Sequence, residues 1–575
     1  MRLAFKTAFT CCHPIFLPAL RRTFHTRNLP TKTLTLGFGF YPCRAIMAVP
    51  SRPPVQVRDN VQLNETEQKI FDRLLGTLRR FGLQNQLRVA GGWVRDKLLG
   101  KECYDIDISL DNMLGSEFVD KVQDYVLHVG EEAQGIAVIP CNPDQSKHLE
   151  TARMHIRDRW IDFVNLRCEE YCENSRIPTV HKYGTPEEDA YRRDLTINSL
   201  FYNLNTSSIE DYTKRGIEDL TSGVIVTPLP SKATFMDDLL RVLRAICFGA
   251  RFGFILDEEL KEAAACDEVK AALSVKITRE RIGTEIDLMI SGNQPVQALA
   301  YISDLKLFWV VFSLHTKHEP EVSEGWDRLC VSYLVATWNL IQLIGLSNFT
   351  DKQRRLSLYA AMFLPLRKTM YKDNRGKKVW FPWFDSMVNY IFRDSLKRKA
   401  SDAETVVNVH FAMEKFLFLI PYFASNEDAR VSDVNWARES VDAPLTSKPW
   451  VLTGFLLREI KDFWRVALLM STLLYPPNID CTEDLLSKNF ELERRRSLFK
   501  AAEDAIFKLG LAKVWDVKPL LNGKEIMNVL QLKTGGPLVR EWQQKILAWQ
   551  HARPSGTAEE CLNWMWKTHC LKMID

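Results

Sequence analysis

Two aspartates stand two positions apart in a short, glycine-containing stretch of the sequence. The stretch is VAGGWVRDKLLGKECYDIDISL (residues 89–110), and Asp105 and Asp107 lie in its alternating end. In an extended strand such residues share one face, with Cα atoms about 6–7 Å apart. Carboxylates at this spacing repel each other unless a cation neutralises them, and Mg²⁺ is commonly held by one or two carboxylates together with substrate phosphates. The spacing therefore predicts a pair of Mg²⁺ ions held by Asp105 and Asp107.

The glycines of this stretch fit the same chemistry. Gly91 and Gly92 lack a Cβ, so their backbone can approach a polyphosphate and offer its N–H groups. A calcium loop of the EF-hand type is excluded, because Leu110 stands at its glycine position and Ser116 at its twelfth position. A Walker A loop is excluded because the local GKE follows the predicted helix instead of preceding it. The alternative left open is a pair of aspartates merely exposed on an edge strand.

A second polar group lies in GTPEEDAYRRDLTINSLFYN (184–203). Arg192, Arg193 and Asp194 precede Asn198 on a helix predicted to open after Pro186. One helix face would then carry guanidinium, carboxylate and amide groups, as a triphosphate and a ribose require. The alternative is a set of ordinary surface ion pairs.

A third group lies in TFMDDLLRVLRAICFGARFGF (234–254). Asp238 and Arg241 stand at i and i+3, on one face of a predicted helix, and Arg244 follows one turn later. An isolated surface ion pair would also explain Asp238 and Arg241. Three such groups in this order favour a nucleotide site.

The elements that must position these residues can be read from hydrophobic periodicity. Asn64 and Gly82 bound an amphipathic helix, LRVAGG is a strand that ends in glycines, WVRDKLLG is a short helix and YDIDISL is a strand. A further helix is predicted at 115–129, with strands at 135–140, 149–156 and 160–166. Short links between mixed elements predict a compact α+β head over residues 59–230, followed by a helical neck (231–292) and a helical body and tail (293–575).

Composition excludes several classes. Of 575 residues, 46% are hydrophobic and 26% charged, which excludes a disordered or fibrous chain. The most apolar windows, 332–349 and 463–477, are interrupted by polar residues or proline, so no membrane span is predicted. The 13 cysteines include no CxxC pair, which favours reduced thiols in an intracellular protein over a zinc site.

The first 58 residues are basic, rich in threonine and without an acidic residue before Asp59. This composition predicts a transit peptide for the mitochondrion or the chloroplast, with a disordered basic tail as the alternative. A start at Met47 would give a cytosolic or nuclear form. Without this segment the chain has a negative formal charge, so a nucleic acid must be held by local basic patches.

The ordered motifs resemble those of the tRNA nucleotidyltransferases that add CCA to tRNA, class II of the polymerase-β-like superfamily, and the plant forms most closely. The resemblance covers roughly residues 60–290. The matching residues are Gly91, Gly92, Val94, Arg95, Asp96, Asp105 and Asp107 in the first motif, Arg192, Arg193, Asp194 and Asn198 in the second, Asp211, Gly216, Asp219 and Leu220 in the third, Asp237, Asp238 and Arg241 in the fourth, and Arg281, Ile282 and Glu285 in the fifth.

The resemblance implies a polymerase-β-like head with a mixed sheet, an all-helical neck, body and tail, and template-independent addition of CCA from CTP and ATP with release of pyrophosphate. Asp105 and Asp107 would hold two Mg²⁺ ions, and superfamily members often place a third strand carboxylate where Asp162 stands. The implied binding residues are Gly91, Gly92, Arg95, Asp96, Arg192, Arg193, Asp194 and Asn198 for phosphate and ribose, and Asp238, Arg241 and Arg244 for base selection.

The chain also departs from the family pattern. Asp237 replaces the usual glutamate, Leu239 a frequent proline, and Cys247 and Val226 frequent arginines. A poly(A) polymerase of the same class remains an alternative, although no basic signature follows the two aspartates, and so does a catalytically silent tRNA-binding protein. The expected partners are the tRNA 3′ end, CTP and ATP, with no membrane and with a monomer favoured.

Overall fold

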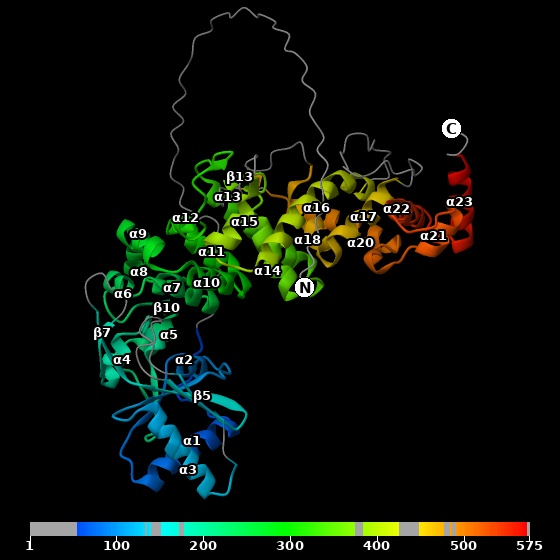
Figure 1. Ribbon diagram of the computed structural model, residues 1–575. Helices are drawn as coiled ribbons and strands as arrows, with labels where there is room; N and C mark the ends of the chain where they lie inside the picture. The colour runs from blue at the N-terminus through cyan, green and yellow to red at the C-terminus, as the bar shows by residue number, and fades with distance from the viewer. Residues whose placement is uncertain are drawn as a thin grey trace, which may run out of the picture. The chain divides into compact units, whose positions relative to one another are not determined.

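The computed structural model describes residues 55–132, 135–139, 151–171, 178–373, 383–424, 448–476, 484–485 and 490–571 (Figure 1). Within these residues a mixed β-sheet with helices comes first, and the rest is mostly helical. The predicted fold class is therefore confirmed. Nearly all of the predicted transit peptide, residues 1–58, lies outside the described residues.

The head is built on a seven-stranded sheet in the spatial order β3-β4-β5-β2-β1-β8-β9. β2 and β5 run parallel, and the other neighbouring strands are antiparallel. β2 lies between β1 and β5, so both of its edges are hydrogen-bonded. The strands are β1 (Leu87–Ala90), β2 (Ile106–Leu110), β3 (Ile136–Ile139), β4 (Thr151–Ile156), β5 (Arg159–Asn165), β8 (Phe201–Asn203) and β9 (Ser208–Glu210).

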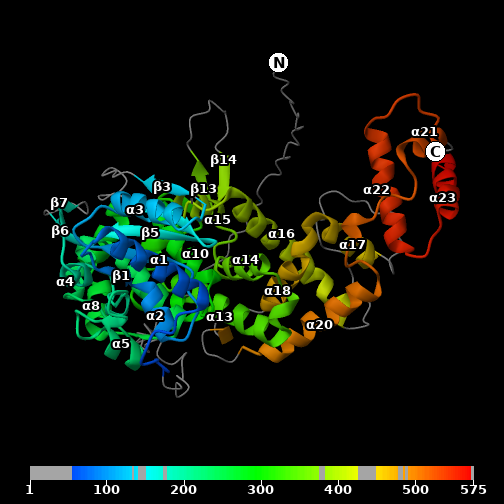
Figure 2. The ribbon, with the colours of Figure 1, turned by 90° about the horizontal axis from the view of Figure 1, so that it is seen from below.

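Two amphipathic helices pack together against this sheet. α1 (Glu65–Phe81) begins after Asn64, whose side chain accepts a hydrogen bond from the Glu67 amide at 2.9 Å, and it ends at Gly82 with φ of 64°. α3 (Gly115–His128) contacts α1, β4 and β5, and Figures 1 and 2 show the two helices side by side. Ile106 and Ile108 of β2 share their apolar core, so the alternate side chains of β2 point to the other face of the sheet.

The predicted helices at 64–82 and 115–129 and the predicted strands around Asp105 and at 160–166 are confirmed. The predicted strands at 135–140 and 149–156 are present as β3 and β4, although residues 140 and 149–150 lie outside the described residues. β8 and β9 were not predicted, and neither was the separate hairpin of β6 and β7. The remaining head elements are β6 (Arg167–Tyr171), β7 (Pro178–Tyr183), α2 (Gly92–Leu98), α4 (Pro186–Tyr191), η3 (Thr196–Asn198), α5 (Gly216–Ser222) and β10 (Val224–Ile225).

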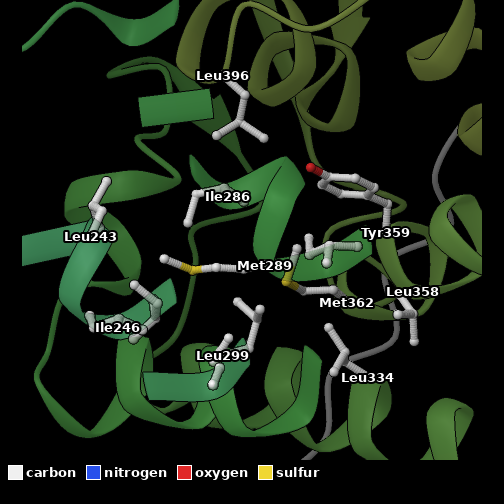
Figure 3. Packing of buried hydrophobic residues seen from close by; sticks show 14 of the residues in the cluster. Leu243, Ile246, Ile286, Met289, Leu299, Leu334, Leu358, Tyr359, Met362 and Leu396 are labelled. Carbon is white, nitrogen blue, oxygen red and sulfur yellow. The ribbon is translucent and has the colours of Figure 1, made fainter. Parts of the chain in front are cut away.

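The neck is a group of five helices, and its β11 (Ile255–Leu256) pairs in parallel with β10 of the head. α7 contacts α10 and α11 (Pro295–Asp304), and Figure 3 shows Ile246, Met289 and Leu299 of these helices near one another in the buried core. The neck helices are α6 (Ser231–Asp237), α7 (Leu240–Phe252), α8 (Glu258–Ala265), α9 (Asp267–Lys276) and α10 (Arg279–Ser291).

The body and tail are mostly helical, as predicted, but the body also carries a small antiparallel sheet that was not predicted. Its strands are β12 (His318–Glu319), β13 (Met370–Asp373) and β14 (Trp383–Ser386). The longer helices are α11 (Pro295–Asp304), α13 (Trp326–Ile344), α14 (Asp351–Met362), α16 (Ala400–Ala424), α17 (Lys448–Ile460), α18 (Trp464–Leu474), α20 (Leu492–Lys508), α22 (Pro537–Ala552) and α23 (Ala558–Leu571), and the shorter ones are α12 (Phe308–Val311), α15 (Met387–Tyr390), η5 (Ile391–Ser395) and α21 (Gly523–Val529).

One helix in the described part of the chain, α16, is long and apolar enough to cross a membrane by length and composition alone. Half of its apolar window is buried, and it packs against α14, α17, α18 and α20. These contacts are typical of the core helix of a helical body.

The tail has a hydrophobic core of its own, formed by α21, α22 and α23. Trp542 and Trp549 lie in this core, with exposures of 3% and 5%. These two rings stabilise the tail and are not available to stack on a nucleobase.

Candidate active site

One cavity of about 610 Å³ brings together residues from the head and from α7 of the neck. Of the predicted site residues, only Gly91 and Asp162 are absent from its lining. The predicted residues that line it are Gly92, Arg95, Asp96, Asp105, Asp107, Arg192, Arg193, Asp194, Asn198, Asp238, Arg241 and Arg244. We call this cavity the active-site pocket.

The two strand aspartates converge on this pocket. Asp105 directly precedes β2 and Asp107 lies within it, on the face opposite Ile106 and Ile108. The pKa of Asp107 is raised to about 6, first by burial and then by the charges of Asp105 and Asp162, while nearby arginines lower it by less. The ionised form of a carboxyl group with such a raised pKa would be stabilised by a bound cation.

Asp162 is the direct neighbour of Asp107 across the parallel β2–β5 pair. Its carboxylate is paired with Arg153 of β4, whose Nη2 donates a hydrogen bond to Oδ2 at 2.8 Å. Among the described residues no group of three or more His, Cys, Asp or Glu side chains is arranged to hold a metal ion. Asp105 and Asp107 both line the pocket, and their carboxylate oxygens are of the kind that Mg²⁺ prefers.

Gly91 shapes the turn between β1 and α2. Its φ is +71°, and its amide donates a hydrogen bond to the Leu200 carbonyl at 2.8 Å. A Cβ at this position would lie 2.6 Å from Nη1 of Arg193. The expectation that Gly91 offers its N–H to a phosphate is wrong for this conformation, because that N–H is engaged within the head. The glycine is needed for its positive φ and for the close approach of Arg193.

Arg95 lies at the centre of a buried polar chain. It is 3% exposed, and its Nε donates a hydrogen bond to Asp96 at 2.9 Å while Nη1 donates to the Asn198 side chain. Its guanidinium also lies over the rings of Phe248 and Phe252, at 5.0 and 4.7 Å from their centroids. The head is thereby linked to α7 of the neck through one cation.

The series of buried polar contacts continues from Arg95 through Asn198 to Asp194. Asn198 donates a hydrogen bond to Oδ1 of Asp194 at 3.0 Å, and Nε of Arg244 donates to Oδ2 at 2.8 Å. Burial alone would raise the pKa of Asp194, but the charge of Arg244 and the hydrogen bonds outweigh burial and lower it. Asp194 is therefore ionised, and it fixes Arg244 at the pocket wall.

Arg192 and Arg193 are held by an aspartate that the sequence analysis did not single out. Both pair with Asp189, which is 1% exposed, through Nε of Arg192 at 2.7 Å and Nη2 of Arg193 at 2.8 Å. Burial would raise the pKa of Asp189, but the two guanidinium groups lower it to about 2. The signal in the sequence is the i, i+3 and i, i+4 spacing from Asp189 to the two arginines.

Two expected helices are interrupted at the site. The helix that opens at Pro186 ends at Tyr191, so Asp194 and Asn198 do not share a helix face with the arginines and are instead joined directly.

Asp238 also lies outside the helix predicted for it. It sits between α6 and α7 with extended backbone, φ −140° and ψ 104°, so it does not share a helix face with Arg241. Its carboxylate accepts hydrogen bonds from Arg281 at 3.1 Å and from the Leu240 amide at 3.1 Å. Nη2 of Arg241 donates instead to the carbonyl of Arg192 at 2.6 Å. The two residues reach the pocket from different elements, and of the three predicted base-selection residues α7 carries only Arg241 and Arg244.

The pocket also contains residues that the sequence analysis did not propose, among them Cys103, Arg167, Phe248 and Arg251. The repeated aromatic and basic residues of RAICFGARF were a signal for Phe248 and Arg251. Cys247 is neutral, because burial raises the pKa of its thiol to about 11.

Residues 87–226 match the family described as the poly A polymerase head domain. The mitochondrial CCA tRNA nucleotidyltransferase of Saccharomyces cerevisiae is 32% identical, over 83% of this chain and 87% of that protein. The tRNA nucleotidyltransferase cca2 of Schizosaccharomyces pombe is 31% identical, over 88% of this chain and 98% of that protein.

The fold is similar to that of the CCA-adding enzyme of Bacillus stearothermophilus in complex with CTP, with a TM-score of 0.56 and 16% identity, over 89% of this chain and 99% of that chain. The similarities extend beyond the head into the helical part. The likeness to plant members stays a prediction.

Proposed function

Because this chain belongs to the family of CCA tRNA nucleotidyltransferases, we propose that it adds C, C and A to the 3′ end of tRNA from CTP and ATP, without a nucleic-acid template, and releases pyrophosphate. The observation that carries the proposal is the active-site pocket, where Asp105 and Asp107 lie within one cavity together with arginines and with Asp238. That set supplies what nucleotidyl transfer requires: ligands for divalent cations, charge for phosphates and groups that can read a base.

Asp105 and Asp107 are the proposed ligands of Mg²⁺. The raised pKa of Asp107 supports this assignment, because a carboxylate next to another carboxylate and away from water gains most from a bound cation. Two bound ions would supply activation of the 3′-hydroxyl and neutralisation of the triphosphate charge. Asp162 has a weaker case as a ligand, since Arg153 already neutralises it.

The cationic wall of the pocket is the proposed triphosphate site. Arg192 and Arg193 are positioned by Asp189, while Arg95 is positioned by Asp96 and Asn198. A guanidinium offers five N–H donors, so each arginine retains donors for phosphate oxygens beyond those used in these pairs. Gly92 lines the pocket, and its missing Cβ leaves space beside Arg95.

Asp194 and Asn198 are proposed to act on the ribose, and Asp238, Arg241 and Arg244 on the base. The carboxylate of Asp238 can accept from the exocyclic amine that cytosine and adenine share, where uracil and guanine present a carbonyl oxygen. Arg241 can donate to the neighbouring ring acceptor. Each good bidentate contact discriminates by about 1–3 kcal/mol, so both residues together would exclude the wrong bases.

The helical body and tail (293–575) are proposed to contact the tRNA. Two stretches of this part interleave aromatic and basic residues, 367–384 and 540–554. Residues 374–382 of the first lie outside the described residues, and the tryptophans of the second, Trp542 and Trp549, are buried. A mitochondrial location is proposed from the basic, acid-free residues 1–58 and from the mitochondrial relative. Targeting to the chloroplast, and a cytosolic or nuclear form starting at Met47, remain proposals based on composition alone.

Incubation of the protein with a tRNA that lacks its CCA end tests the function. We expect CTP alone to add two nucleotides, CTP with ATP to add three and no more, and EDTA to abolish both reactions. Continued addition of A would indicate the poly(A) polymerase alternative. Asp105→Ala should stop incorporation while tRNA binding is retained, and a wild-type protein that binds tRNA without incorporation would support the silent binding protein instead.

A further inference from the structure

A second cavity of about 640 Å³ lies next to the active-site pocket and shares Asp105 with it. It is formed by the β4–β5 hairpin together with the segment that leads into β2. We call it the hairpin pocket. Its lining residues are Thr66, Tyr104, Asp105, Arg153, Arg157, Asp158, Arg159 and Trp160.

Two aromatic side chains of the hairpin pocket are exposed. Tyr104 is 68% exposed and Trp160 is 46% exposed. Each ring packs against a neighbouring side chain: the Arg159 guanidinium lies 5.0 Å from the centroid of the Tyr104 ring, and the centroid of the His155 ring lies 5.2 Å from that of Trp160. Each aromatic ring is thus supported by a neighbour while much of its surface faces solvent. Supported and exposed rings beside positive charge are the usual platform for the bases of single-stranded RNA.

Three arginines supply the positive charge. Arg153 is paired with Asp162, Arg157 lies 3.5 Å from Glu131 at partly exposed positions, and Arg159 lies 3.7 Å from Glu67. The Arg159 contact is longer than a hydrogen bond, and its buried Nη1 has no hydrogen-bond partner among the described residues. Arg157 is exposed and loosely paired, so its guanidinium can bind a phosphate oxygen without losing a strong internal contact.

The turn of the β4–β5 hairpin has non-glycine residues at two positions of positive φ. Arg157 and Asp158 form the two-residue turn between Ile156 and Arg159, with φ of 49° and 64°. Two-residue hairpin turns with positive φ at both positions favour Asn-Gly, since a Cβ disfavours this backbone. The chain therefore holds an exposed arginine at the rim of the hairpin pocket in a turn that disfavours it.

From these observations we infer that the hairpin pocket receives the unpaired 3′ end of the tRNA, with Trp160 and Tyr104 stacking on its bases and Arg157 contacting a phosphate. The inference rests on the proposed function. If the incoming nucleotide fills the active-site pocket, the 3′-hydroxyl must reach Asp105 from another side, and the hairpin pocket adjoins that residue. Its volume is within the range that accommodates a nucleotide-sized group.

Equilibrium binding of tRNA to the full chain tests the inference, with a tRNA that ends before CCA and one that ends in the first CC. Trp160→Ala should weaken binding of the longer tRNA about tenfold, as expected for one lost stacking contact, and that of the shorter tRNA less. The KM for tRNA should rise while the KM for CTP stays the same. Val138→Ala, which truncates another exposed side chain of the sheet, and Arg80→Ala, an exposed arginine on α1, are the matched controls.

The turn offers a variant that separates binding from folding. Arg157→Asn with Asp158→Gly installs the preferred turn and should raise the Tm, yet it should weaken tRNA binding severalfold, because the arginine is lost. Unchanged binding in this variant and in Trp160→Ala, with wild-type CCA addition intact, overturns the inference and leaves the proposed function standing. Failure of the wild-type protein to add nucleotides would instead overturn the proposed function.

Discussion

Replacement of Asp189 by asparagine removes the charge that positions two arginines of the active-site pocket. The side chain keeps its size, but Arg192 and Arg193 lose their common partner. The pKa of Asp189 falls from 3.8 to about 2 in the folded protein, and at 1.36 kcal/mol for each pKa unit this corresponds to about 2 kcal/mol of stabilisation at neutral pH. For a domain of the size of the head, such a loss lowers the Tm by roughly 4–8 °C.

The pH dependence of this loss has a defined sign. Because the folded pKa of Asp189 lies below its unfolded value of 3.8, the stabilisation is complete well above that value and is lost as the pH falls toward 2. The difference in Tm between the wild-type protein and Asp189→Asn should therefore be constant near neutral pH and shrink between about pH 4 and pH 2.

The effect on activity should be confined to binding of the incoming nucleotide. Because two arginines of the proposed triphosphate site would lose their common partner, we expect the KM for CTP to rise about tenfold, which is about 1.4 kcal/mol, and the KM for tRNA to change much less. Steady-state kinetics and thermal unfolding at several pH values measure these quantities. Glu187→Gln removes the same charge from an exposed position on α4 and is the matched control. An Asp189→Asn protein with wild-type Tm and wild-type KM for CTP would refute the reasoning.

Two other perturbations follow from the described contacts. Gly91→Ala should lower both Tm and activity, because the new Cβ would lie 2.6 Å from Arg193 in a backbone of positive φ. Gly82→Ala is the control: its φ is +64° but the space around it is open, so the Tm should fall slightly and activity should stay unchanged. Burial lowers the pKa of His410 from 6.5 to about 4. As the pH falls from 6.5 to 4, proton uptake by the unfolded chain should therefore lower the free energy of unfolding of the wild-type protein by about 3 kcal/mol. The free energy of unfolding of His410→Gln, measured with urea, should depend less on pH by this amount.

The positions of Asp105 and Asp107, the proposed metal ligands, were the part of the pocket that the sequence predicted best. Asp105 and Asp107 needed only the alternation of YDIDISL, since a period of two places them on one face and Ile106 and Ile108 on the other. The order of the motifs predicted that the arginines, Asp194 and Asp238 would be close to these aspartates, and they line one pocket.

The wrong predictions arose where helical spacing was extended past the end of a helix. The helix from Pro186 ends at Tyr191, and α6 ends before Asp238, so spacing along one continuous helix did not describe either group. Contacts between distant segments, such as Arg281 with Asp238 and Arg241 with the Arg192 carbonyl, decided these positions instead. Helical spacing carries no information about such contacts.

The sequence by itself determined the chemical groups and the elements that carry them, because periodicity and capping residues act over a few neighbouring positions. Only the tertiary structure decided that Asp189 anchors the arginines, that Arg95 joins the head to Phe248 of the neck, and that the β4–β5 hairpin lies beside Asp105. These pairings depend on burial and on the packing of segments far apart in the chain, where a low dielectric makes each charge select a specific partner.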